Sequence, residues 1–160
     1  MDDTQLTFTI HGQTPAQKNG KSVGRVQATG RTFVASSPTV KKWQKESLEE
    51  LNLVLRGIRF RSPTGRIKID YAFYVKDDVQ RDTDNMIASV NDLLQVVSAD
   101  RAPDKKGKMK PVKKTGLIPG DHWQVLQLGQ PHVEIDKENP RAVIRLSEYE
   151  GENENQWWTI

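Results

Sequence analysis

Two aspartates separated by one residue carry the clearest chemistry in this sequence. Asp82 and Asp84 precede an apolar-periodic run that ends near Val97. In an extended segment, residues two apart point to the same side, so the carboxylates are expected together at the end of a strand. Their oxygens would suit a hard cation such as Mg2+. The structural alternative is that Asp84 or its neighbour caps the following helix, with Asp82 as an ion partner of Arg81.

A third carboxylate, Asp121, stands ahead of a strand predicted over 123–128. If this strand returns beside the strand predicted over 66–75, Asp121 can meet Asp82 and Asp84. Three adjacent carboxylates repel one another unless a cation lies between them. Mg2+ held there would polarise a phosphate and lower the pKa of a bound water for in-line attack.

The hydrophobic periodicity predicts the elements that position these residues. A helix is predicted from a cap at Ser36, Ser37 or Thr39 to Gly57, and a second one follows Asp82. The predicted strands lie at 6–10, 32–34, 66–75, 123–128 and 142–146. Residues 16–30 are predicted as a loop or loose hairpin, and 98–120 as a long loop without regular structure. Because strands and helices do not alternate regularly, we expect an α+β fold: a mixed sheet of about five strands with two main helices on one face.

Length and composition exclude several classes of protein. A chain of 160 residues predicts one domain, placed at 1–147, with 148–160 as an acidic tail. The absence of cysteine excludes disulfides, thiolate zinc sites and a cysteine nucleophile. No segment has the pattern of a signal peptide or a membrane span, so a cytoplasmic protein without a membrane partner is expected. An EF-hand is excluded because the sixth position counted from Asp82 is Ile87 rather than Gly.

Charge is strongly segregated along the chain. The four glutamates after Ser147 contribute −4, so the rest of the chain carries +7 within a total of +3. Segregated positive charge is typical of a nucleic-acid partner, although a solvated basic surface would have the same composition. The candidate phosphate-binding residues are Lys18, Lys21, Arg25, Arg31, Lys105, Lys106, Lys108, Lys110, Lys113 and Lys114.

The order of these motifs resembles the RusA family of Holliday-junction resolvases. The matching elements are Asp82-x-Asp84-Asn85, the helical Asp92-Leu93-Leu94, and Gly120-Asp121-x-x-Gln124-Val125. The opening Phe8-x-Ile10-x-Gly12-x-x-Pro15-x-x-Lys18 and the helix that contains Trp43 also fit. The resemblance covers roughly residues 6–147.

The resemblance implies a small homodimeric endonuclease, bacterial or phage-encoded, often from a prophage. Such an enzyme depends on Mg2+, with Mn2+ as a possible substitute, and cuts four-way DNA junctions symmetrically in recombination and repair. By position, Asp82, Asp84 and Asp121 would be its catalytic metal ligands. Asn85 and Asp92 would be supporting positions. His122, beside Asp121, is a candidate for a supporting or proton-transfer role, or is incidental.

The sequence departs from the family pattern in ways that bear on catalysis. Ala88 stands where the family commonly has Lys, and Gly120 replaces the first residue of an Asp-Asp pair. The loop at 98–120 is also longer than is usual in the family. An alternative is therefore a weak or inactive junction-binding protein on the same scaffold. A metal-stabilised structural protein without DNA affinity is a third possibility.

Overall fold

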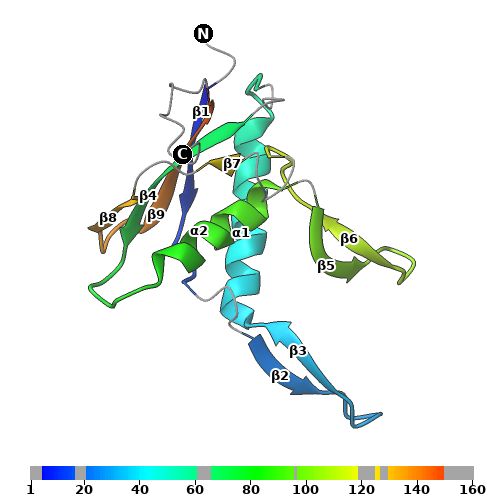
Figure 1. Cartoon of the computed structure of the whole chain (residues 1–160). Helices are drawn as coiled ribbons and strands as arrows, with labels where there is room; N and C mark the ends of the chain where they lie inside the picture. Colours follow the sequence, from blue (N-terminus) through cyan, green and yellow to red (C-terminus); the bar gives the residue numbers. More distant parts are fainter. Residues whose placement is uncertain are drawn as a thin grey trace, which may run out of the picture.

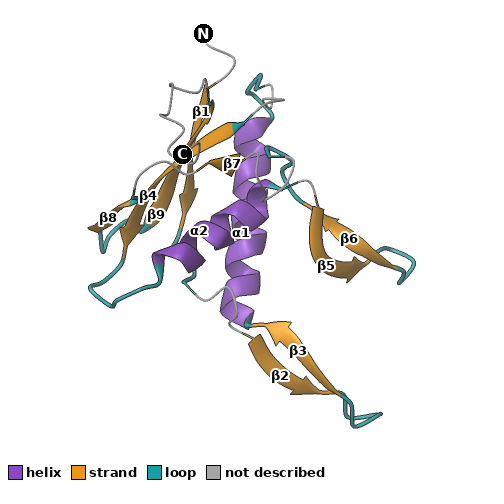
Figure 2. Ribbon diagram, in the orientation of Figure 1, coloured by secondary structure: helices purple, strands orange, loops and turns teal. Residues whose placement is uncertain are grey.

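The computed structural model describes residues 5–16, 21–60, 66–95, 97–118, 125–126 and 130–149. Their order along the chain is β1 (Gln5–His11), β2 (Lys21–Arg25), β3 (Thr32–Ser36), α1 (Pro38–Leu55), β4 (Ile67–Val75), α2 (Thr83–Leu94), β5 (Val97–Pro103), β6 (Met109–Lys113), β7 (Val125–Leu126), β8 (His132–Ile135) and β9 (Arg141–Glu148). Figure 1 follows this order by colour, and Figure 2 shows the sheet, the two helices and two projecting hairpins.

A mixed five-stranded sheet forms the centre of the fold. β9 lies between β1 and β4 and is antiparallel to both, whereas β7 and β8 pair with β4 in parallel. β7 lies beside the start of β4, where Val125 is opposite Ile67, and β8 lies beside its end, where Ile135 is opposite Val75. The expected α+β class with a mixed sheet and two helices is confirmed. β8 was not predicted.

The sheet is buried on the face that the helices cover. β4 alternates strictly between buried and half-buried residues, as a strand with one core face should. Its buried set joins residues of the neighbouring strands and both helices in one core, which includes Leu6, Phe8, Ile10, Trp43, Leu51, Ile67, Ile69, Tyr71, Phe73, Val75, Val90, Leu93, Leu94, Ile144 and Leu146. Within this core the Tyr71 hydroxyl donates to Asn91 Oδ1 on α2 at 2.5 Å, which joins the helix to the strand.

Both helices begin at side-chain caps. Ser37 Oγ accepts from the Val40 N–H at 3.3 Å, with Pro38 in the first turn of α1 as predicted. α2 begins after Asp82 and ends at Leu94, where Gln95 turns to extended backbone. The prediction that its apolar run extends to Val97 is wrong, because Val97 begins β5.

Two antiparallel hairpins stand apart from the sheet in Figure 1. β2 pairs with β3 and β5 pairs with β6, each in a two-stranded sheet of its own. The loose hairpin considered for 16–30 is thus a regular one that includes 32–36. The prediction of a long loop without regular structure over 98–120 is wrong, because the β5–β6 hairpin with its turn spans residues 98–113. Among the described helices, none has the length and apolarity needed to cross a bilayer.

Candidate metal site and nucleic-acid interface

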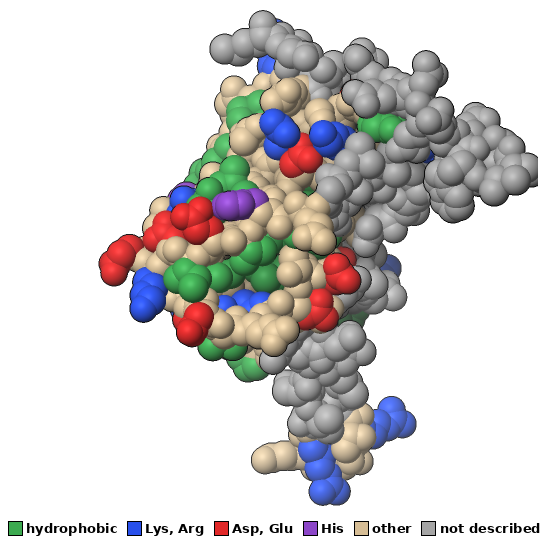
Figure 3. Space-filling view, turned by 60° about the vertical axis from the view of Figure 1, so that its left-hand side comes forward, with side chains coloured by type: hydrophobic (Ala, Val, Ile, Leu, Met, Phe, Trp, Pro, Cys, Tyr) green, Lys and Arg blue, Asp and Glu red, His purple; other side chains and the backbone are tan. Residues whose placement is uncertain are grey.

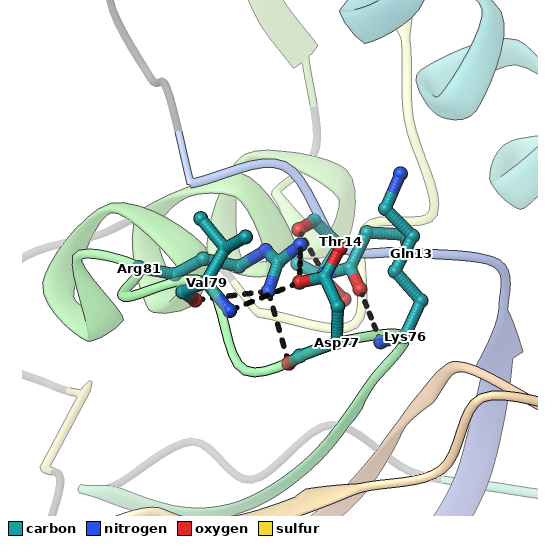
Figure 4. Close-up of polar contacts among 6 residues, drawn as sticks. All are labelled: Gln13, Thr14, Lys76, Asp77, Val79 and Arg81. Atoms are coloured by element: carbon teal, nitrogen blue, oxygen red, sulfur yellow. Dashed lines mark hydrogen bonds and ion pairs between the residues drawn. The ribbon is translucent and has the colours of Figure 1, made fainter.

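The loop between β4 and α2, which delivers Asp82, is closed by an arginine (Figure 4). Arg81 forms an ion pair with Asp77, with 2.6 Å between Nη2 and Oδ1, and its Nη1 donates to the Val79 carbonyl at 3.1 Å. Partial burial acts to raise the pKa of Asp77, but the hydrogen bonds from Arg81 and the Val79 N–H, with the positive charges of Arg81 and Lys76, together hold that pKa below the ordinary value of 3.8. The pairing of Arg81 with Asp82, considered as the structural alternative, is not what forms, since Arg81 turns back to Asp77.

A glutamine ties this loop to the end of β1. Gln13 Oε1 accepts from the Lys76 backbone N–H at 2.9 Å, while Gln13 Nε2 donates to the Thr14 carbonyl at 3.0 Å. Figure 4 shows the Gln13 side chain between these two segments. The backbone before Asp82 is therefore held both within its own loop and to the segment that follows β1.

Asp82 is the N-cap of α2. Its Oδ1 accepts from the backbone N–H groups of Asp84, at 3.0 Å, and Asn85, at 3.3 Å. Its Oδ2 accepts from the Asn85 side-chain amide at 2.8 Å. The expectation that Asp82 and Asp84 lie side by side on an extended segment is wrong. The backbone turns into the helix at Thr83, because capping by Asp82 satisfies N–H groups that the first helical turn leaves free.

The other residues that the resemblance singled out after Asp82 lie on α2. Asp84 is exposed in the first turn, and its carboxylate has no hydrogen bond or ion pair within the described residues. An acid there interacts favourably with the positive end of the helix dipole. Ala88, one helical turn after Asp84, is half-buried, and so is Asp92 near the end of the helix. Asn85 orients Asp82 through the amide contact described above.

A cleft of about 690 Å³ adjoins Asp82. Its walls come from the segment after β1, the first turns of α1 and the loop before α2, so the N-terminal ends of both helices face it. Lys76 and Arg81 also line it. Lys76 and the helix N-termini favour an anion in this cleft, whereas the Asp82 carboxylate opposes it and Arg81 is already paired with Asp77.

The segment that carries Asp121, with His122, lies outside the described residues, but its flanks are described. Ile118 N–H donates to the Leu94 carbonyl at the last turn of α2, at 2.9 Å. Val125 lies beside Ile67 at the start of β4. The pairing with β4, on which the approach of Asp121 to Asp82 depends, is present and parallel at Val125 and Leu126. The approach of Asp121 itself stays a prediction.

No group of three potential metal-ligating side chains occurs within the described ranges. The donor set at Asp82 and Asp84 nevertheless fits Mg2+, which is commonly held by one or two carboxylates together with waters and substrate phosphates. Of the roughly four lone-pair positions of the Asp82 carboxylate, three accept the hydrogen bonds given above. Counting contacts among the described residues, one position on Oδ2 remains for a cation.

The two hairpins carry most of the basic residues singled out in the sequence. Arg25 and Arg31 are exposed at the turn of the β2–β3 hairpin. Figure 3 shows Lys or Arg side chains gathered at the far end of this projecting part. The β5–β6 hairpin carries Lys105, Lys106, Lys108 and Lys110, all exposed. Lys21 and Lys113 belong to β2 and β6, Lys114 directly follows β6, and Lys18 lies outside the described residues.

Sequence reasoning missed two parts of this site. The Arg81–Asp77 pair was missed because Asp82 is the nearer acid in the sequence. A signal was present, because an aspartate that caps a helix has its oxygens occupied, and Arg81 would then pair with another acid. The contact from Gln13 had no sequence signal, because 63 residues separate it from Lys76. Comparisons with protein-family models, with curated proteins and with solved structures found no match to this chain.

Proposed function

We propose that this protein is a RusA-like, Mg2+-dependent endonuclease that cuts branched DNA as a homodimer in recombination and repair. The observation that carries the proposal is the pairing of an exposed carboxylate site with two separate basic hairpins. Asp82 and Asp84 begin a helix beside a cleft that Lys76 also lines. A cytoplasmic protein encoded by a bacterium or its phage fits this activity.

The carboxylates are suited to hold a cation in a fixed position. The amide of Asn85 and two backbone N–H groups restrict the rotation of the Asp82 side chain. Asp84 extends from the first turn of the same helix without a competing partner in the described part of the chain. Bound Mg2+ would supply charge neutralisation on the scissile phosphate and an acidified water. Asp121 remains a proposed third ligand, with His122 and Asp92 as proposed supporting residues.

The hairpins are suited to hold the DNA. Exposed Lys and Arg side chains bind phosphates without regard to sequence, and their affinity falls as salt concentration rises. A two-stranded hairpin has little stability by itself, which favours its use as an adaptable arm that a partner stabilises. A four-way junction has two-fold symmetry, so a closed dimer would present two sites for two cuts.

A cleavage assay tests the proposal. Wild-type protein, Asp82→Asn and Asp78→Asn are incubated in Mg2+ with a labelled four-way junction and with linear duplex. Asp78 is a matched control because it is exposed, lies in the same loop and has no partner among the described residues. We expect paired nicks on the junction from the wild type and from Asp78→Asn, and no nicks from Asp82→Asn, which retains junction binding.

One observation favours a second candidate, a junction-binding protein without catalysis. Asp82 already has a structural role as a helix cap, and Ala88 supplies no charge one turn from Asp84. If the wild type binds the junction tightly and cuts neither substrate in Mg2+ or Mn2+, the binding protein is the correct assignment. If it binds no DNA at any salt concentration, both assignments are wrong.

A further inference from the structure

The turn of the β5–β6 hairpin, residues 104–108, is built around one acidic side chain. Asp104 Oδ1 accepts from the backbone N–H groups of Lys106 and Lys108, both at 2.9 Å. The main chain closes the same turn, where Asp104 N–H donates to the Lys108 carbonyl and Gly107 N–H donates to the Asp104 carbonyl, both also at 2.9 Å. Four hydrogen bonds thus involve Asp104 within five residues.

Glycine and a lysine complete the turn. Gly107 has a φ of +76°, which is in the left-handed region that glycine adopts without strain. The Nζ atom of Lys110 on β6 lies 3.0 Å from Asp104 Oδ2. The hydrogen bond from Lys110 and those from the backbone of Lys108 and Lys106 hold the pKa of Asp104 below 3.8, so it is charged at neutral pH.

The position of this acid is unusual for a polyanion-binding element. Asp104 is the one acidic residue among residues 104–114, which include six lysines. By charge alone, a carboxylate among these lysines weakens the attraction to phosphate. The hydrogen bonds of Asp104 favour phosphate binding, because they fix the backbone from which three exposed lysines extend. These are Lys105, Lys106 and Lys108, whose side chains form no ion pair within the described residues.

We propose that Asp104 is a positioning residue that holds the turn so that Lys105, Lys106 and Lys108 meet the DNA backbone together. The inference rests on the proposed function, because it takes DNA phosphates as the partner. A turn that is ordered before binding loses less conformational freedom on contact with DNA than a mobile one. The carboxylate therefore increases the affinity for a polyanion although its charge opposes it.

Two substitutions at the same residue separate shape from charge. Asp104→Asn and Asp104→Ala both remove one negative charge. Asn keeps a side-chain oxygen that can accept the two backbone N–H groups, as asparagine does in such turns, whereas Ala keeps none. Affinity for a fluorescent four-way junction is measured by anisotropy over a series of salt concentrations. Glu138→Ala, a substitution of an exposed acid elsewhere, gives the effect of one charge by itself.

We expect Asp104→Asn to bind at least as tightly as the wild type, and Asp104→Ala to bind about twofold to tenfold more weakly than Asp104→Asn. The slope of log affinity against log salt should become shallower in Asp104→Ala, by about 0.9 for each lysine that no longer contacts a phosphate. Amide hydrogen exchange at Lys106 and Lys108 should accelerate in Asp104→Ala and stay slow in Asp104→Asn.

Equal or tighter binding by Asp104→Ala than by Asp104→Asn overturns the inference, as do unchanged exchange rates at the two amides. Both results leave the proposed nuclease standing, because the wild type would still bind and cut the junction. A wild type that binds no DNA overturns the inference and the proposed function together.

Discussion

Asp82→Ala should destabilise the protein, whereas Asp82→Asn should not. Alanine removes all three acceptor contacts of Asp82, including the cap of two backbone N–H groups. Loss of an N-cap costs about 0.5–2 kcal/mol. Since Asp82 is exposed and water can reach the freed groups, we expect about 1 kcal/mol, which lowers Tm by about 2–4 °C in a chain of this size. Asparagine caps a helix about as well as aspartate, and the Asn85 amide can rotate so that its oxygen accepts from Asn at position 82.

Thermal and urea unfolding followed by circular dichroism measure these changes, with Asp78→Ala as the control for removal of an exposed acid in the same loop. An Asp82→Ala protein as stable as the wild type would refute the capping role that the structure gives to Asp82. Equal losses in Asp82→Ala and Asp82→Asn would show that charge, and not the acceptor oxygen, stabilises the start of α2. In that case Asp82→Asn would no longer be a clean probe of catalysis.

Three further predictions concern the core and the pH dependence. Tyr71→Phe should cost about 1–3 kcal/mol in urea unfolding, because buried Asn91 loses its hydrogen-bond donor; an unchanged free energy would contradict this. Phe73→Ala should cost about 3–5 kcal/mol in the same assay, since Phe73 is fully buried in the sheet, and a loss below 1 kcal/mol would mean that the core is packed differently. The hydrogen bond from Arg141, against the opposing effect of partial burial, holds the pKa of Asp136 below 3.8 in the folded protein. The charged Asp136 carboxylate therefore stabilises the folded protein fully when the pH is above the pKa of the unfolded state. This stabilisation is lost as the pH falls through the lower pKa of the folded state. The Tm of the wild type should exceed that of Asp136→Asn at neutral pH, and this difference should shrink below pH 3.8; a difference that persists there would contradict the prediction.

The sequence predicted well those elements in which the buried side chains and the residues at the ends of the element indicate the same structure. Alternation over 66–75 predicted β4 because every second side chain enters the core. Three candidate caps and Pro38 marked the start of α1, and the structure selects Ser37 among them. The β5–β6 hairpin was missed because Pro103, Pro111 and a run of lysines give its strands little intrinsic preference. β8 was missed because all four of its residues are exposed, so burial leaves no period-two signal.

The candidate site was harder to predict because two physical roles compete for the same residues. The sequence Asp-x-Asp fits both an extended carboxylate pair and a capped helix. Helix formation prevailed at Thr83, because the apolar face that follows includes fully buried Val90 and Leu93. The approach of Asp121 to Asp82 stays a prediction, because Asp121 lies outside the described residues. Periodicity predicted a strand near Val125, but it does not reveal the strand direction, and β7 runs parallel to β4.

In the proposed enzyme, binding and reaction depend on different parts of the chain. The lysines and arginines of the hairpins are attached to two-stranded sheets outside the core, so changing them should alter DNA affinity and leave the fold intact. Asp82 lies at the start of a helix whose buried face completes the core, so its orientation is set by the fold and not by DNA. Removing its charge relieves repulsion with phosphate and therefore does not weaken DNA binding by itself. Loss of cutting with retained affinity in Asp82→Asn is consequently the pattern that a nuclease of this architecture must give, and loss of both together would place Asp82 in the structural framework alone.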